Sequence, residues 1–121
     1  MARILIIEDD SLVRSMLKAT MEREGHEVLD APDGIKGAKL YREKSADLVI
    51  TDIVMPDKEG IETILELKRL SPGLKIIAIS GGGRIGPETY LELAGKFGAE
   101  RTFVKPIDRK ELVKAVQELL D

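Results

Sequence analysis

Short, unbroken apolar runs followed by segments of helical periodicity are the feature that most constrains the fold of this chain. The clearest runs cover residues 4–7, 48–50 and 76–79, and weaker runs cover residues 28–29 and 103–104. Because the runs are continuous rather than alternating, they indicate strands that are buried on both faces of a sheet. Five such strands alternating with five helical segments predict an α/β fold, a (βα)5 doubly wound parallel sheet with right-handed crossovers.

The helical segments carry start and stop signals. Apolar residues recur at helical spacing from Leu12 to Met21, and Gly25 follows where a helix cap is expected. Asp108 with Glu111 predicts the cap of the last helix, which ends near Leu120. The other three segments are expected over residues 33–44, 61–71 and 87–97. Within the first of these three, Gly37 costs about 1 kcal/mol relative to alanine.

Length and composition exclude several classes of protein. With 121 residues, 43% hydrophobic and 34% charged, the chain is expected to form one globular domain over residues 1–121. A net charge of −3 argues against direct binding to nucleic acid. The absence of cysteine excludes thiolate metal sites, and the single histidine, His26, is expected to be structural. No segment is apolar enough for a membrane span or a secretory signal, so a cytoplasmic location is expected.

Polar residues follow the strands at the points where the apolar runs end. In an open parallel sheet, ligands bind beyond the carboxyl ends of the strands, so these residues share one edge. They are Glu8, Asp9 and Asp10 after the first run, Asp52 after the third, Ser80 after the fourth and Lys105 after the fifth. The sequence therefore predicts a site of three or four carboxylates, one hydroxyl and one amine.

Clustered carboxylates repel one another, so this edge needs a cation. Mg²⁺ fits, because it prefers hard oxygen ligands and is commonly held by one or two carboxylates together with a phosphate. Lys105 and Ser80 can bind phosphoryl oxygens, the first as a compact charge and the second as a hydrogen-bond donor. Asp52 is then free to act as a nucleophile toward a phosphoryl group.

Three sequence blocks carry a resemblance to a known family. Residues 4–10 read ILIIEDD, residues 48–56 read LVITDIVMP and residues 103–107 read FVKPI. Together they resemble the response regulator receiver domain, the phosphoacceptor module of two-component signalling that includes the chemotaxis receivers. The resemblance covers essentially the whole chain and implies the flavodoxin-like strand order 2-1-3-4-5.

The resemblance also implies a role for each site residue. Asp52 would accept a phosphoryl group from a phosphohistidine. Glu8 and Asp9 would hold Mg²⁺ with Asp52, and the backbone carbonyl of Val54 would be a further ligand. In the family Asp10 is less often a direct ligand than the two acids before it.

The remaining implied roles concern phosphoryl binding and switching. Lys105 would pair with the phosphoryl group, with a cis bond to Pro106 as in many family members, and Ser80 would be the switch hydroxyl. The family usually has an aromatic residue at the position of Thr102. The conformational change on phosphorylation would then take place in the glycine-rich loop over residues 81–86 instead of through rotation of an aromatic side chain.

The implied function is a phosphorylation-dependent signalling switch rather than an enzyme. Its partners would be a sensor histidine kinase or phosphotransfer protein and an unidentified output protein, with phosphorylation-dependent dimerisation left open. In the family, two positions beside the phosphoryl group influence its hydrolysis, and the resemblance places Val54 and Gly82 there. Neither side chain can orient a water molecule, which predicts slow self-dephosphorylation.

Three other functions share this architecture. A Mg²⁺-dependent phosphohydrolase would need a second acid two residues after the nucleophile, where this chain has Val54. A flavin carrier would need a phosphate-binding loop where this chain has acids after its first strand. A degenerate receiver serving as a scaffold would not need the complete set of site residues.

Overall fold

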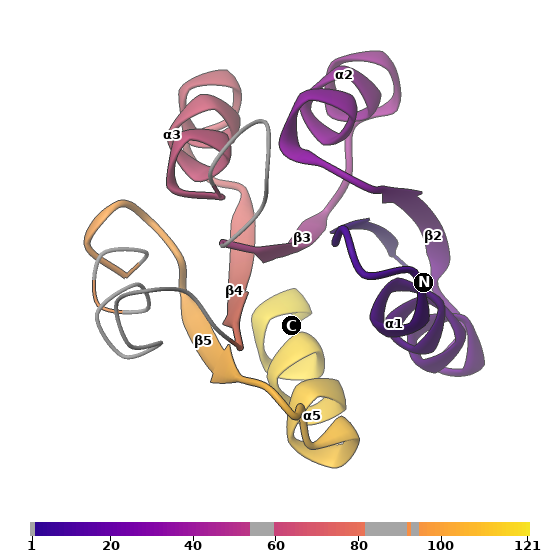
Figure 1. Ribbon diagram of the computed structural model, residues 1–121. Helices are drawn as coiled ribbons and strands as arrows, with labels where there is room; N and C mark the ends of the chain where they lie inside the picture. Colours follow the sequence, from indigo (N-terminus) through magenta and orange to yellow (C-terminus); the bar gives the residue numbers. More distant parts are fainter. Residues whose placement is uncertain (1, 54–59, 82–91, 93–94) are drawn as a thin grey trace.

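One parallel sheet forms the centre of the molecule. The computed structural model describes residues 2–53, 60–81, 92 and 95–121. Its strands are β1 (Arg3–Ile7), β2 (Glu27–Ala31), β3 (Leu48–Asp52), β4 (Lys75–Ser80) and β5 (Arg101–Val104). They pair in parallel in the order β2-β1-β3-β4-β5 (Figure 1). This confirms both the α/β fold and the strand order that the family resemblance implied.

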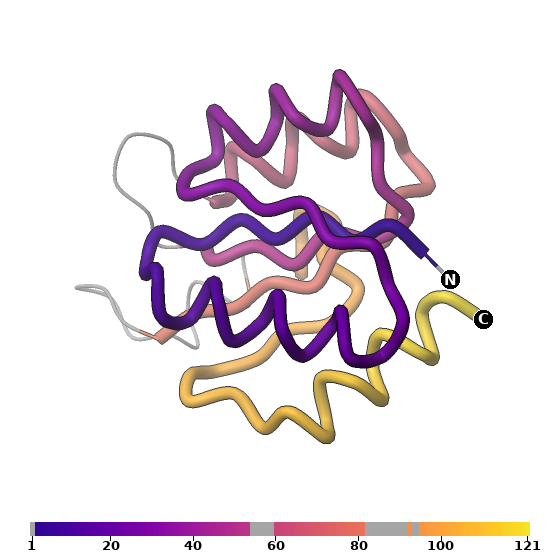
Figure 2. The backbone as a smooth tube through the Cα atoms, turned by 90° about the vertical axis from the view of Figure 1, so that its right-hand side faces the viewer, coloured from indigo at the N-terminus to yellow at the C-terminus, as the bar shows by residue number. Residues whose placement is uncertain are grey.

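Helices cover both faces of the sheet. They are α1 (Ser11–Arg23), α2 (Gly34–Lys44), α3 (Gly60–Leu70) and α5 (Arg109–Leu120). One face is covered by α1 and α5 and the other by α2 and α3 (Figure 1). Most of the helix expected over residues 87–97 lies outside the described residues. Figure 2 shows that both chain ends lie on the side of the molecule opposite the carboxyl ends of the strands.

The core consists of two apolar layers, one on each face of the sheet. Successive side chains of a strand point to opposite faces, so Ile4 and Ile6 pack in the layer beneath α1 and α5. Leu5 and Ile7 pack in the layer beneath α2 and α3. All four are fully buried, and burying a side chain of this size contributes about 1.5–3 kcal/mol. Burial on both faces explains why the runs are continuous in sequence.

Aspartates cap three of the helices. The Asp10 carboxylate accepts hydrogen bonds from the backbone amides of Leu12 and Val13, which satisfies donors that have no partner inside α1. Asp33 caps α2 and Asp108 caps α5 in the same way, and the cap predicted at Asp108 is thereby confirmed. At the other end of α1, Gly25 has a φ of 92°.

Two glycines allow helices to lie close to the sheet. A Cβ atom at Gly37 would lie 2.7 Å from Cγ1 of Ile7, so the residue that weakens α2 by propensity lets it pack against β1. A Cβ atom at Gly60 would overlap the Cα atom of Ile53 and lie 2.6 Å from the carbonyl oxygen of Asp52. The first turn of α3 therefore rests against the backbone at the end of β3.

The close approach at Gly60 predicts that Gly60→Ala is strongly destabilising. The added methyl group meets backbone atoms, which cannot move aside as a side chain can, and we expect the free energy of unfolding to fall by about 3 kcal/mol. Urea unfolding followed by circular dichroism measures this loss. Gly73→Ala is the matched control, because no atom lies within 4 Å of a Cβ at that position. Equal stability of the two variants would contradict the expectation.

Candidate functional site

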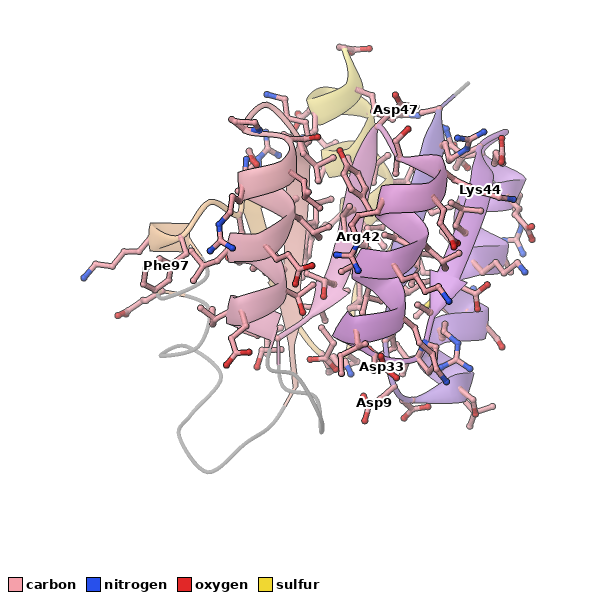
Figure 3. The ribbon with its side chains drawn as sticks, turned by 90° about the horizontal axis from the view of Figure 1, so that it is seen from above. Asp9, Asp33, Arg42, Lys44, Asp47 and Phe97 are labelled. Carbon is pink, nitrogen blue, oxygen red and sulfur yellow. The ribbon has the colours of Figure 1, made fainter. Side chains whose placement is uncertain are left out.

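The residues that follow β1 place one buried and one exposed carboxylate at the edge of the sheet. Glu8 is fully buried, and its backbone amide donates a 3.0 Å hydrogen bond to the carbonyl oxygen of Ala31. Its Oε2 atom accepts a 3.1 Å hydrogen bond from the backbone amide of Asp10. Asp9 is exposed and lies at the same end of the molecule as Asp33, opposite Asp47 (Figure 3).

A third carboxylate joins this pair from β3. Asp52 ends that strand and is 4% exposed. Carboxylate oxygens of Glu8, Asp9 and Asp52 lie within 4.8 Å of one another. Three carboxylates at this spacing, with one of them exposed to solvent, are a donor set suited to a hard divalent cation such as Mg²⁺.

Lys105 brings a positive charge to the same place from β5. Its Nζ atom donates a 2.9 Å hydrogen bond to Oδ2 of Asp52 and lies 2.8 Å from Oε1 of Glu8 as an ion pair. The Lys105 backbone amide donates a 2.9 Å hydrogen bond to the carbonyl oxygen of Ser80, and the peptide bond to Pro106 is cis. A Cβ atom at Gly81 would lie 2.6 Å from Cδ of Lys105, so glycine leaves room for the lysine side chain.

Ser80 is a buried hydroxyl without a partner. The residue is fully buried at the end of β4, and its Oγ atom has no hydrogen-bond partner among the residues that the structure describes. Buried polar groups usually have a partner, and a group without one at a functional edge suggests that the partner is a ligand. Thr102 is exposed and pairs with Ala78, two positions before the level of Ser80.

Several predicted features lie outside the described residues. They are the Val54 carbonyl, Gly82 and the remainder of the loop over residues 82–86.

Two contributions were missed by sequence reasoning. Asp10 was counted with the acids of the site, whereas its side chain caps α1; its position just before a helical pattern is the signal that could have shown this. Gly81 was predicted to belong to the loop that absorbs the conformational change, and the space that it leaves for the Lys105 side chain was not predicted.

Burial raises the pKa of Glu8. Its carboxyl has a pKa of about 7 instead of 4.5, because desolvation disfavours the charged form and the negative charge of Asp52 adds to this effect. The ammonium group of Lys105 and the Asp10 amide act in the opposite direction but compensate only in part. The pKa of Lys105 is raised: burial lowers it, but contacts with Glu8 and Asp52 outweigh the burial. In the site without a cation, burial and the neighbouring Asp52 therefore disfavour the charged form of Glu8.

Comparison with known proteins identifies the family. The sequence matches the response regulator receiver domain over residues 4–117. It is 31% identical to the chemotaxis protein CheY of Halobacterium salinarum, over 98% of this chain and 96% of that protein. It is 35% identical to the DNA-binding transcriptional regulator NtrC of Azospirillum brasilense, over 99% of this chain but only 24% of NtrC.

The fold comparison agrees. A CheY-like receiver domain protein from Methanospirillum hungatei superposes with a TM-score of 0.91 at 30% identity, covering 100% of this chain and 94% of that one. A receiver domain protein from Clostridium thermocellum superposes with a TM-score of 0.90 at 32% identity, covering 99% of this chain and 94% of that one.

The chain belongs to the response regulator receiver domain family, whose members are signalling domains of two-component systems rather than classical enzymes. Receivers of this family bind Mg²⁺ at an acidic pocket, and this chain has the acidic group for it. Within the described part of the chain, no helix has the length and apolar character needed to cross a membrane.

The raised pKa of Glu8 predicts how pH changes the stability of the metal-free protein. Between pH 4.5 and about 7 the folded state holds a proton on Glu8 that the unfolded state has lost, so stability falls as pH rises. Glu8 contributes a loss of up to about 3 kcal/mol across this window. Urea titrations at pH 5 and 8 in the presence of a chelator should show this slope, and Glu8→Gln should remove it. An equal slope in the variant would contradict the assignment.

The unpartnered hydroxyl predicts a difference between two buried substitutions. Ser80→Ala should change the free energy of unfolding by less than about 0.5 kcal/mol, because no hydrogen bond to a described residue is lost. Thr51→Val is the matched control: it removes a buried hydroxyl that donates a 3.0 Å hydrogen bond to the Asp52 carbonyl oxygen and should cost about 1 kcal/mol. Urea unfolding compares the two. A loss for Ser80→Ala as large as that for Thr51→Val would show that the Ser80 hydroxyl stabilises the unphosphorylated protein.

Proposed function

We propose that residues 1–121 form one receiver domain that accepts a phosphoryl group on Asp52 and thereby switches its binding to a partner. The observation that carries the proposal is the bridge made by Lys105. One ammonium group contacts both Glu8 and the nearly buried Asp52 at the edge where three carboxylates converge. A lysine held against the acceptor in this way is placed to bind a phosphoryl oxygen once Asp52 is modified.

Mg²⁺ is the cofactor that the donor set fits. Glu8, Asp9 and Asp52 would hold it, and the family resemblance adds the backbone carbonyl of Val54. When bound, Mg²⁺ supplies positive charge that offsets the negative charge of the carboxylates and of phosphoryl oxygens. The raised pKa of Glu8 is in line with this assignment, because burial disfavours the charged form of Glu8 in the metal-free protein and a bound cation would favour it.

In the proposed reaction, one carboxylate oxygen of Asp52 forms a bond to phosphorus as the phosphorus–nitrogen bond of a phosphohistidine breaks. The imidazole leaves with the bonding electron pair and takes up a proton, and Asp52 becomes an acyl phosphate. Lys105 exchanges its contact with the unmodified Asp52 carboxylate for one with a phosphoryl oxygen. The Ser80 hydroxyl, which has no partner among the described residues, donates a hydrogen bond to another phosphoryl oxygen.

The donor would be a sensor histidine kinase or a phosphotransfer protein, and the output would be a change in binding to a partner protein. Relatives differ in how the output is organised. CheY of Halobacterium salinarum has nearly the length of this chain, whereas the matched region is about a quarter of the NtrC of Azospirillum brasilense. We infer that Ser80, at the end of β4, and Thr102, in the first half of β5, transmit the change to that partner.

Intact-mass analysis after incubation with acetyl phosphate and Mg²⁺ tests the proposal directly. We expect one phosphoryl adduct that is lost in Asp52→Asn and after chelation. Asp47→Asn is the matched control, since Asp47 is an exposed aspartate at the opposite end of the molecule (Figure 3), and it should keep the adduct.

The alternative outcomes are also informative. An adduct that persists in Asp52→Asn would contradict the assignment of the acceptor. No adduct in a protein shown separately to bind Mg²⁺ would favour a scaffold that keeps the site without the chemistry.

A further inference from the structure

Arg14 connects the acidic loop to the neighbouring strand. It lies in the second turn of α1, and its Nη1 atom donates a 2.7 Å hydrogen bond to the backbone carbonyl oxygen of Glu8. Its Nε atom lies 3.2 Å from Oδ2 of Asp30 in β2. One guanidinium group thus joins three elements: the end of β1, helix α1 and strand β2.

The carbonyl that Arg14 holds belongs to the peptide group between Glu8 and Asp9, the two proposed Mg²⁺ ligands that follow β1. The direction of that peptide plane determines where both side chains point. On its amide side Glu8 is held by β2, because its N–H group donates to the Ala31 carbonyl oxygen at 3.0 Å. On its carbonyl side Glu8 accepts the hydrogen bond from Nη1 of Arg14. Arginine suits this task because its rigid, planar group of donors can bind two acceptors at fixed angles.

We propose that Arg14 is a positioning residue that orients the Glu8–Asp9 pair for Mg²⁺ binding, an inference that rests on the proposed function of the site. Its own charge works against the metal. A guanidinium group bonded to the Glu8 backbone repels a cation bound beside it, so by charge alone the removal of Arg14 would tighten Mg²⁺ binding. If Arg14 orients the two acids, its removal instead weakens Mg²⁺ binding. The two explanations therefore predict changes of opposite sign.

Lys18 provides a matched control on the same helix face. It lies four residues after Arg14, one turn along α1, and its Nζ atom is 3.6 Å from Oδ1 of the same Asp30. Both residues are cations of α1 paired with Asp30. Of the two, Arg14 also donates a hydrogen bond to the Glu8 carbonyl oxygen. Arg14→Met and Lys18→Met remove the same charge, and only the first removes the support of the acidic loop.

Mg²⁺ titration by isothermal calorimetry is the test. Arg14→Met should bind Mg²⁺ about tenfold more weakly than the wild type, the low end of what is lost when the support of a metal ligand is removed. Lys18→Met should bind as tightly as the wild type or slightly more tightly. Arg14→Lys, which keeps the charge and one donor group, should recover part of the loss. Equal affinity of the two methionine variants, or tighter binding by Arg14→Met, would overturn the proposal.

A second measurement needs no metal and separates this inference from the proposed function. Backbone ¹⁵N order parameters of Asp9 and Asp10 in metal-free protein should fall in Arg14→Met and stay unchanged in Lys18→Met, because only the first variant frees the loop. Asp9→Asn serves as the control for the site itself. If wild type and Asp9→Asn both fail to bind Mg²⁺, the metal assignment fails, and the order parameters alone decide whether Arg14 orients the loop. Unchanged order parameters in Arg14→Met would then overturn it.

Discussion

The candidate site at the carboxyl ends of the strands depends on the contact of Lys105 with Glu8 and Asp52. The parallel arrangement brings the ends of β1 and β3 together, and with them three carboxylates that repel one another. The amine of the half-buried Lys105 reaches them from the end of β5 and partly compensates. Burial, with the charge of Asp52, disfavours the charged form of Glu8 more than the lysine favours it, so the pKa of Glu8 remains high. A divalent cation bound among these carboxylates would offset their repulsion and favour the charged form of Glu8.

Residues outside the cluster of carboxylates and lysine hold the site residues in place. Asp10 caps α1, Gly60 lets α3 rest against the end of β3, and Gly81 leaves space for the Lys105 side chain. Arg14 also supports the site indirectly, because it donates to the backbone carbonyl oxygen of Glu8 and not to a carboxylate of the cluster. Each of these residues limits the positions that the acids and the lysine can take, so the geometry of the site is set largely by packing and capping.

The fold and the location of the site were predictable from sequence because both follow from burial. Continuous apolar runs indicate a sheet covered on both faces, and polar residues at the ends of those runs then share one edge. The direction of individual side chains was not predictable. Asp9 and Asp10 are adjacent acids, yet one joins the carboxylate cluster and the other caps a helix. The contact between Lys105 and Asp52 spans 53 residues and depends on how two strands and a loop are placed. Likewise Gly37 is explained only by its contact with Ile7 of β1, and Gly60 by its contact with the backbone of Asp52 and Ile53.

The position of the chain ends has a consequence for how a signal would travel. Both ends lie at the edge of the sheet opposite the strand ends that carry Asp52 (Figure 2). A strand such as β3, with five residues, is about 17 Å long. A group joined to this domain through Leu120 and Asp121 would therefore be separated from Asp52 by the length of the strands and of α5. A fluorescent reporter fused at either end would, for the same reason, leave the end of the sheet that carries Asp52 uncovered.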